Sequence, residues 1–242
     1  YTDNTTLETL AFSGINSIAG GTAADELQGD ANADLFTLSG TGAGTLDAVA
    51  FTGIETLSGL GGDDEFRLGG DFTADIHGGA DGAAGDKIVA SASATAFTLS
   101  AAGAGTAQVI GGTQTATFDG VENVTGNAGN DTFAINASQT GVLDGGEGSD
   151  TFTVGAAATL AGAGVRLTGG ADAAGNDTDT LNVAAKTAAL TVSLTGSTAN
   201  LGVAGTEATV FTTAGGGFAA IDTLVGSADT LQGPNVASTW TE

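Results

Sequence analysis

Cysteine and methionine are absent from this chain of 242 residues, proline occurs once, and lysine and arginine together number four. The lack of cysteine excludes disulfides and thiol chemistry and is compatible with export. The shortage of basic side chains removes the usual means of binding nucleic acids or anionic membrane surfaces. His77 is the only histidine, so a metal site built from several histidines is excluded as well. We therefore expect no nucleic-acid binding. Because long apolar spans are also missing, we expect no membrane insertion.

The residues that are abundant point to turns and strands. The chain has 28 Asp and Glu residues, 42 Gly residues and a net charge of −24. Most of the acids are Asp, which disfavours helix interiors and favours turns through hydrogen bonds between its side chain and the backbone. Hydrophobic residues make up 41%, but many of them are Ala, and Phe supplies most of the aromatic surface. This composition predicts an all-β protein with a thin core and with cations as its natural counterparts.

Internal repeats organise the chain. One repeat reads FSGINSIAGGTAADEL at 12–27, FTGIETLSGLGGDDEF at 51–66, FDGVENVTGNAGNDTF at 118–133 and, shortened, FAAIDTLVGSADTL at 218–231. A second reads FTLSGTGAGT at 36–45 and FTLSAAGAGT at 97–106. A third has a Gly-rich turn before an Asp and an apolar run: IHGGADGAAGDKIV from Ile76, VLDGGEGSDTFTV from Val142, and RLTGGADAAGNDTDTLNV from Arg166. Each copy of the third repeat predicts a strand, a tight turn and another strand.

Asp residues mark the expected beginnings of strands. In DTFAI, Phe133 and Ile135 alternate with polar or small residues, as in a strand with one buried face. The Asp residues that open such segments are Asp25, Asp64, Asp86, Asp131, Asp150 and Asp179, separated by 39, 22, 45, 19 and 29 residues. Most of these separations approximate one or two coils of roughly 20 residues.

This periodicity favours a right-handed parallel β-solenoid, with repeats of an antiparallel β-sandwich as the alternative. About a dozen coils stacked at about 4.8 Å would make a rod of roughly 55–60 Å. We expect one continuous repeat rod over 1–242, an internal fragment of a larger protein, with approximate units 1–33, 34–90, 91–154, 155–183 and 184–242.

Residues 145–153, GGEGSDTFT, match the nonapeptide GGxGxDxUx, where U is a large apolar residue. The match resembles the RTX calcium-binding β-roll. By that resemblance Asp150 is a Ca²⁺ ligand, with the carbonyls of Gly146 and Gly148 as partners, and Asp86 and Asp131 are further candidate ligands. The other turns match the nonapeptide only in part. The alternative, which we favour for any single Asp, is that its carboxylate accepts hydrogen bonds from backbone amides and caps a strand.

Other charged residues give little support for catalysis. Asp63, Asp64 and Glu65 form the densest acidic group, which we interpret as a solvated turn because adjacent residues of a strand point to opposite faces. The basic residues are scattered among different repeats: Arg67, Lys87, Arg166 and Lys186. We therefore expect no enzyme, with a polysaccharide lyase or glycosidase on a β-helix as the lesser alternative.

The combination of F-x-G-I-E-x-L-x-G, LDGGxGxDxF and LQGPNVASTW, the last at 231–240, resembles the strand repeats of giant bacterial exoproteins. These include filamentous-haemagglutinin-like and biofilm-matrix adhesins with RTX-like elements. The resemblance implies an acidic, secreted stalk at the cell surface or in the biofilm matrix. It implies other cells, matrix polysaccharide or neighbouring repeats of the same protein as partners, and calcium as the candidate cofactor, with no cofactor as the alternative. A calcium-dependent module whose folding is coupled to Ca²⁺ is the second hypothesis.

Overall fold

The computed structural model describes residues 14–70, 72–171, 177–197, 202–227 and 229–233. These residues form 23 β-strands in two sheets, and no helix occurs among them. The all-β prediction is therefore confirmed. Accordingly, the described part of the chain contains no helix long and apolar enough to cross a lipid bilayer. Phe12 of the first repeat and Trp240 of the LQGPNVASTW segment lie outside the described residues.

The two sheets contain 13 and 10 strands. The spatial order of the first sheet is β1 (Ser17–Ala19), β5 (Val49–Thr52), β4 (Ala43–Leu46), β3 (Leu35–Gly40), β7 (Glu65–Leu68), β9 (Lys87–Val89), β13 (Asn123–Thr125), β15 (Leu143–Gly146), β17 (Gly164–Gly170), β21 (Gly216–Ile221), β20 (Val203–Thr206), β19 (Thr191–Ser197) and β23 (Thr230–Gln232). The order of the second sheet is β2 (Glu26–Gln28), β6 (Thr56–Gly62), β8 (Asp75–Asp81), β12 (Ala116–Asp119), β11 (Ala104–Val109), β10 (Thr95–Ala101), β14 (Thr132–Ile135), β16 (Thr151–Val154), β18 (Thr180–Asn182) and β22 (Thr223–Val225).

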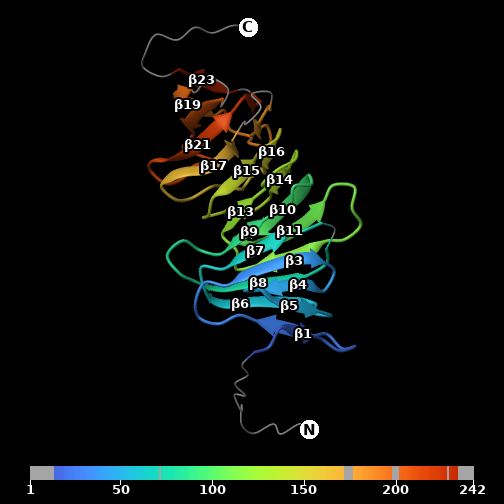
Figure 1. The fold of residues 1–242 in the computed structure, drawn as a ribbon. Coiled ribbons are helices and arrows are strands. Elements are labelled where there is room, and N and C mark those ends of the chain that lie inside the picture. Colours follow the sequence, from blue (N-terminus) through green and yellow to red (C-terminus); the bar gives the residue numbers. More distant parts are fainter. Residues whose placement is uncertain (1–13, 71, 172–176, 198–201, 228, 234–242) are drawn as a thin grey trace.

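The chain alternates between the sheets. A strand of one sheet is followed by a strand of the other, except in three meanders, β3–β4–β5, β10–β11–β12 and β19–β20–β21, each of which stays in one sheet. Among the described strands, antiparallel pairing occurs only within these meanders. All other pairings are parallel, as in β7–β9 and β14–β16. Figure 1 shows the strands stacked along the length of the molecule, from β1 near one end to β23 near the other.

Parallel pairing in register stacks equivalent apolar residues into columns. In the first sheet one column crosses seven strands, and its members are Phe36, Phe66, Ile88, Val124, Leu143, Leu167 and Phe218. Each of these side chains is buried. Because alternate residues of a strand face opposite sides, only one residue in two enters the core. The predicted alternation in β14 is confirmed, since Phe133 and Ile135 are buried.

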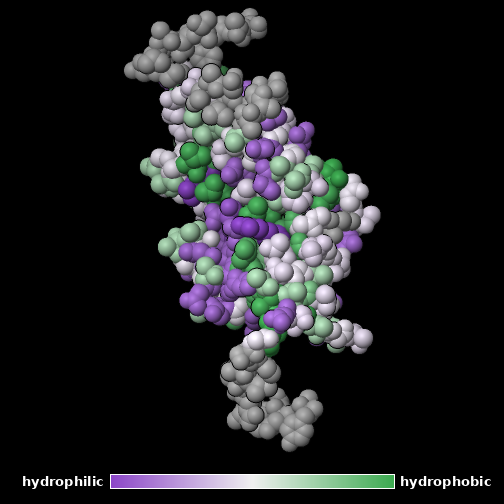
Figure 2. All heavy atoms as spheres, in the orientation of Figure 1, coloured by the Kyte–Doolittle hydropathy of each residue, from purple (hydrophilic) through white to green (hydrophobic). Residues whose placement is uncertain are grey.

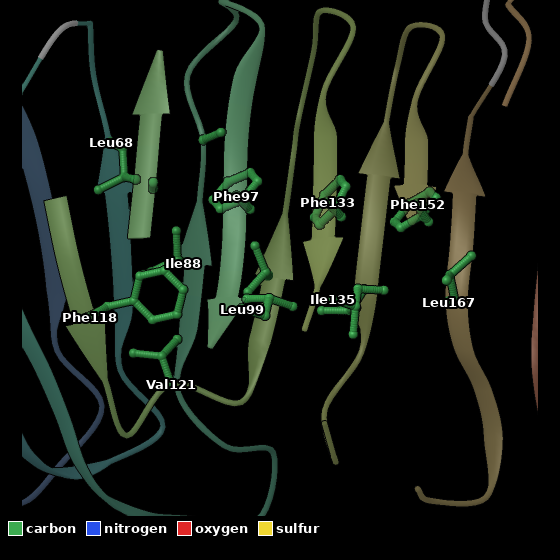
Figure 3. Packing of buried hydrophobic residues seen from close by; sticks show 14 of the residues in the cluster. Leu68, Ile88, Phe97, Leu99, Phe118, Val121, Phe133, Ile135, Phe152 and Leu167 are labelled. Atoms are coloured by element: carbon green, nitrogen blue, oxygen red, sulfur yellow. The ribbon is translucent and has the colours of Figure 1, made fainter. Parts of the chain in front are cut away.

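A second column lies in the second sheet, where Phe97, Phe133 and Phe152 stack on three neighbouring strands (Figure 3). The ring centroids of Phe97 and Phe133 are 5.0 Å apart, and those of Phe133 and Phe152 are 4.5 Å apart. Leu181 and Leu224 continue the column. Stacked rings at these distances add to the free energy of apolar burial. Stacked Phe residues thus form part of a core that also contains many Leu, Ile and Val side chains.

Two of the repeats have copies that lie in opposite sheets. The FTLS segment at 36–39 begins the meander β3–β4–β5 in the first sheet, whereas its copy at 97–100 begins β10–β11–β12 in the second. Likewise, the repeat at 51–66 supplies β5, β6 and β7, and its copy at 118–133 supplies β12, β13 and β14 in the opposite order of sheets. The two copies lie in opposite sheets because the chain crosses from one sheet to the other an odd number of times between the first copy and the second.

The outer surface is mixed. Figure 2 shows hydrophilic residues along the length of the visible face, with hydrophobic residues in separate patches between them. The large exposed hydrophobic residues among those described are Ile15, Leu60, Ile110, Val165, Val225 and Leu231. They come from different parts of the stack.

Candidate functional site

The six Asp residues expected to open strands do so. Asp25, Asp64, Asp86, Asp131, Asp150 and Asp179 immediately precede β2, β7, β9, β14, β16 and β18. Within the first sheet, the amide of Asp34 donates to Oδ1 of Asp64 at 2.7 Å, and the amide of Asp64 donates to Oδ1 of Asp86 at 2.7 Å. Each carboxylate therefore caps the beginning of the neighbouring strand, because it accepts the last amide before that strand.

The second sheet has the same arrangement. Oδ1 of Asp131 accepts the amide of Thr95, Oδ1 of Asp150 accepts the amide of Asp131 at 2.7 Å, and Oδ1 of Asp179 accepts the amide of Asp150 at 2.9 Å. We call these residues the carboxylate ladder. It comprises Asp34, Asp64, Asp86 and Glu122 beside the first sheet, and Asp131, Asp150, Asp179 and Asp222 beside the second.

Two members of the carboxylate ladder, Glu122 and Asp222, come from the F-x-G-I-E repeat, which we had not identified as a source of site residues, and Glu55 of the same repeat caps Asp25 in the same way. The amide of Asp86 donates to Oε2 of Glu122 at 3.1 Å, the amide of Asp179 to Oδ2 of Asp222 at 2.9 Å, and the amide of Asp25 to Oε2 of Glu55 at 3.0 Å. The three acceptors occupy the fifth position of the repeat. The recurrence of an acid at that position is the sequence signal that would have identified them.

The second carboxylate oxygen of several ladder residues is buried without a hydrogen-bond partner. This applies to Oδ2 of Asp64, Asp86, Asp131 and Asp150. Burial raises the pKa of Asp86 to about 6 and that of Asp131 to about 7. Burial, reinforced by neighbouring Asp carboxylates, raises the pKa of Asp150 to about 8. The ladder therefore holds carboxyl groups at positions that disfavour negative charge.

The nonapeptide turn joins β15 to β16. Gly146 and Gly148 have φ values of 98° and 116°, which explains why glycine occupies both positions. The carbonyl of Gly146 accepts the amide of Ala171 at 2.9 Å. Oδ2 of Asp150 is the oxygen of that carboxylate that remains for a cation, since Oδ1 caps Asp131. Capping by Asp150 is thus observed, and the calcium roles of Asp150, Gly146, Gly148, Asp86 and Asp131 stay predictions.

The structure also brings three carboxylates together. One oxygen each from Asp81, Asp86 and Glu122 lies within 4.8 Å of the other two, so this group could hold a metal ion. Burial, followed by the neighbouring Asp81 carboxylate, raises the pKa of Glu122 to about 7. Of these residues only Asp86 was expected from the sequence, because Glu122 is 36 residues away along the chain.

The interpretation of Asp63, Asp64 and Glu65 as a solvated turn is wrong for Asp64. Its side chain is 1% exposed and belongs to the carboxylate ladder. Asp63 accepts the amides of Ala84 and Gly85, and Glu65 pairs with Arg67. The three adjacent acids therefore take different roles, since successive residues at the beginning of a strand point in different directions.

The remaining charged residues that the sequence singled out have structural contacts. Lys186 is buried and donates to the carbonyls of Ala156 and Ala158, and burial lowers its pKa. Arg166 donates to the carbonyl of Thr140. His77 lies in β8 and contacts the carboxylates of Asp119 and Asp75 at 2.8 and 3.7 Å.

Comparison of the chain with protein-family models, with curated proteins and with solved structures finds no match.

Proposed function

We propose that this chain is a structural and adhesive segment, a stalk, of a large secreted bacterial surface or biofilm-matrix protein. The observation that carries the proposal is the in-register column of seven apolar side chains from Phe36 to Phe218. Such a column stacks one layer of the chain on the next, so the molecule grows in one direction as repeats are added. A β-solenoid is the architecture that we propose for it.

Two further features support a stalk. The chain alternates between two sheets, and strands contact mainly their neighbours in the stack, as in other linear repeat proteins. The net charge of −24 keeps such a surface soluble and disfavours association between copies at low salt. On this proposal the segment acts outside the cell, between the cell that carries it and other cells, matrix polysaccharide or neighbouring repeats.

The stalk proposal predicts an elongated, stiff particle. Small-angle X-ray scattering of the purified chain should show the distance distribution of a rod. When the chain replaces a flexible Gly/Ser linker of equal residue number between two fluorescent labels, the distribution of distances between the labels should be narrower, because a stiff rod has one length whereas the linker samples many. A specific hydrolytic activity on polysaccharide that Asp64→Asn or Asp150→Asn abolishes would contradict the proposal, and so would a distance distribution as broad as that of the linker.

The adhesive part of the proposal is tested separately. Beads coated with the chain should retain bacterial cells or purified matrix polysaccharide more strongly than beads coated with the Gly/Ser linker. Equal retention would leave the segment as a spacer without adhesion.

A calcium-dependent module is the second candidate function, and the buried, unpartnered Oδ2 of Asp150 in the nonapeptide turn favours it. Ca²⁺ is the hard cation that carboxylate and carbonyl oxygens prefer outside cells. Binding to the folded chain alone would raise its stability by mass action. The melting temperature should then be higher in Ca²⁺ than in EDTA, and Asp150→Asn should reduce the difference. An unchanged melting temperature would show that calcium does not bind at this turn.

A further inference from the structure

A group of three carboxylates lies where β8, β9 and β13 approach one another. Asp81 is the last residue of β8, Asp86 immediately precedes β9, and Glu122 immediately precedes β13. One oxygen from each lies within 4.8 Å of the other two. Asp81 is exposed, Glu122 is half-buried and Asp86 is fully buried, so the group extends from the surface into the interior. It is separate from the nonapeptide turn of Asp150 in the chain.

Asp86 supplies an independent indication of a ligand. Its Oδ1 accepts the amide of Asp64, but its Oδ2 is buried and has no hydrogen-bond partner. A buried polar atom without a partner costs about 1–3 kcal/mol, and more when it is charged. A cation bound at this oxygen would supply the missing partner.

Oδ2 of Asp86 lies beside β8, the strand that ends at Asp81. A Cβ atom on Gly78 would lie 2.4 Å from Oδ2 of Asp86 and 1.8 Å from the carbonyl oxygen of Gly120. Gly78 lies in β8, three residues before Asp81, and Gly120 lies two residues before Glu122. Oδ2 therefore points between the strand that ends at Asp81 and the segment that leads to Glu122.

The charges of the group are not balanced by the protein. Among the described residues, Arg67 pairs with Glu65 and His77 contacts Asp75 and Asp119, and none of these contacts includes the three carboxylates. The amide of Asp86 donates to Oε2 of Glu122, which orients the Glu122 carboxylate without neutralising it. Three carboxylates at this separation repel one another, and a bound dication would convert that repulsion into attraction.

We propose that Asp81, Asp86 and Glu122 bind one calcium ion, which joins the β8–β9 turn to β13. All three donors are oxygens, which selects hard cations. Two oxygens bound to one Ca²⁺ at 2.3–2.6 Å lie at most about 5 Å apart, and the three oxygens lie within 4.8 Å of one another. Ca²⁺ accepts carboxylate oxygens in a flexible geometry, which suits three side chains that come from separate segments. Water reaches the ion beside the exposed Asp81 and completes its coordination.

The site joins two strands that are neighbours in a sheet but distant along the chain. β9 and β13 are neighbours in the first sheet, but the meander β10–β11–β12 in the second sheet separates them along the chain. Closing a longer loop costs more conformational entropy. An ion held by Asp86 and Glu122 ties the two ends of this excursion together and stabilises the register of the carboxylate ladder across it.

Calorimetric titration of Ca²⁺ into the EDTA-stripped chain tests the site. We expect Asp81→Asn and Glu122→Gln each to weaken binding of one Ca²⁺ at least tenfold. Glu55→Gln is the matched control for Glu122→Gln, because Glu55 accepts the equivalent amide of Asp25. Asp75→Asn, in the same strand as Asp81, is the second control. Both controls should bind Ca²⁺ as the parent chain does.

Thermal unfolding distinguishes ion binding by these carboxylates from a purely structural role of the same residues. In EDTA, Asp81→Asn should raise the melting temperature because it removes repulsion, and added Ca²⁺ should then raise it less than in the parent chain. The proposal is overturned if Asp81→Asn and Glu122→Gln leave the Ca²⁺ affinity within twofold of the parent. It is also overturned if Asp150→Asn alone abolishes all binding, since calcium would then occupy only the nonapeptide turn.

Discussion

At the residue scale, the two oxygens of a ladder carboxylate have different surroundings. Oδ1 of Asp150 accepts the amide of Asp131, while Oδ2 lies in the turn beside Gly145. A Cβ atom on Gly145 would lie 2.1 Å from this Oδ2 and 2.4 Å from the carbonyl oxygen of Gly169. Two acceptor oxygens therefore lie close together, and the ionised carboxylate has no proton to donate to the carbonyl.

This asymmetry predicts opposite effects for two substitutions of Asp150 in EDTA at pH 8. Asp150→Asn keeps an acceptor for the amide of Asp131 and places an N–H donor near the carbonyl of Gly169, so it should stabilise the fold by about 1 kcal/mol. Asp150→Ala leaves the buried amide without an acceptor and should destabilise it by about 1–3 kcal/mol. Urea denaturation measures both. The exposed Asp119→Asn is the control, and an Asn variant as unstable as the Ala variant would contradict this account.

At the element scale, a row of glycines runs beside the carboxylate ladder. A Cβ atom at any of these positions would lie within 2.4 Å of Oδ2 of the Asp that follows, and the positions are Gly29, Gly59, Gly78, Gly126, Gly145 and Gly169. The same Cβ would also approach a backbone carbonyl of the neighbouring layer, as at Gly59 and Gly145. Glycine at these positions allows the turn, the Asp carboxylate and the next layer to pack together.

The packing of these turns predicts a position-specific cost for added side chains. Gly145→Ala should destabilise the chain by about 1–3 kcal/mol, because the methyl group meets both a carboxylate and a backbone carbonyl. Gly40→Ala, in β3, should change stability by less than about 0.5 kcal/mol, because no atom lies within 4 Å of the added Cβ. The midpoints of urea denaturation compare the two variants. Equal effects would show that steric crowding at the turn does not explain the glycine.

At the scale of the whole molecule, burial of carboxyl groups makes the folded chain less negative near neutral pH than its formal net charge of −24. The folded chain raises the pKa of Asp86, Glu122, Asp131 and Asp150 to between about 6 and 8. The folded state therefore binds more protons than the unfolded state between pH 4 and pH 8. The stability from these groups is present below pH 4 and is lost as the pH rises through their folded-state pKa values.

The whole chain should therefore be more stable in mild acid than in mild base. In EDTA we expect the melting temperature at pH 8 to be roughly 5 °C or more below that at pH 5. Calorimetry over this pH range measures the difference, and Asp150→Asn should make it smaller. A melting temperature that rises with pH would show that the carboxylates are stabilised when ionised, contrary to the burial observed. Added Ca²⁺ should reduce the fall, because bound cations offset the charge.

The sequence by itself determined the local features of this protein. Asp25, Asp64 and Asp131 open strands as predicted, because Asp favours the hydrogen bonds that precede a strand and the apolar alternation begins directly after it. The turn at 145–150 was likewise predicted from its glycines. These features depend on a few consecutive residues, so spacing along the chain is sufficient to predict them.

Only the tertiary structure decided which segments meet. It placed the FTLS copies in opposite sheets, buried Asp64 in the ladder, and brought Glu122 to Asp81 and Asp86. Each outcome depends on pairing between segments that lie far apart along the chain, such as Asp34 and Asp64, 30 residues apart, or Asp86 and Glu122, 36 residues apart, with meanders of different length between some of them. Backbone hydrogen bonds that form such pairs are alike for every residue type, so the sequence of a strand does not specify its partner. The physical reason is that register comes from the packing of the complete column, which exists only in the folded chain.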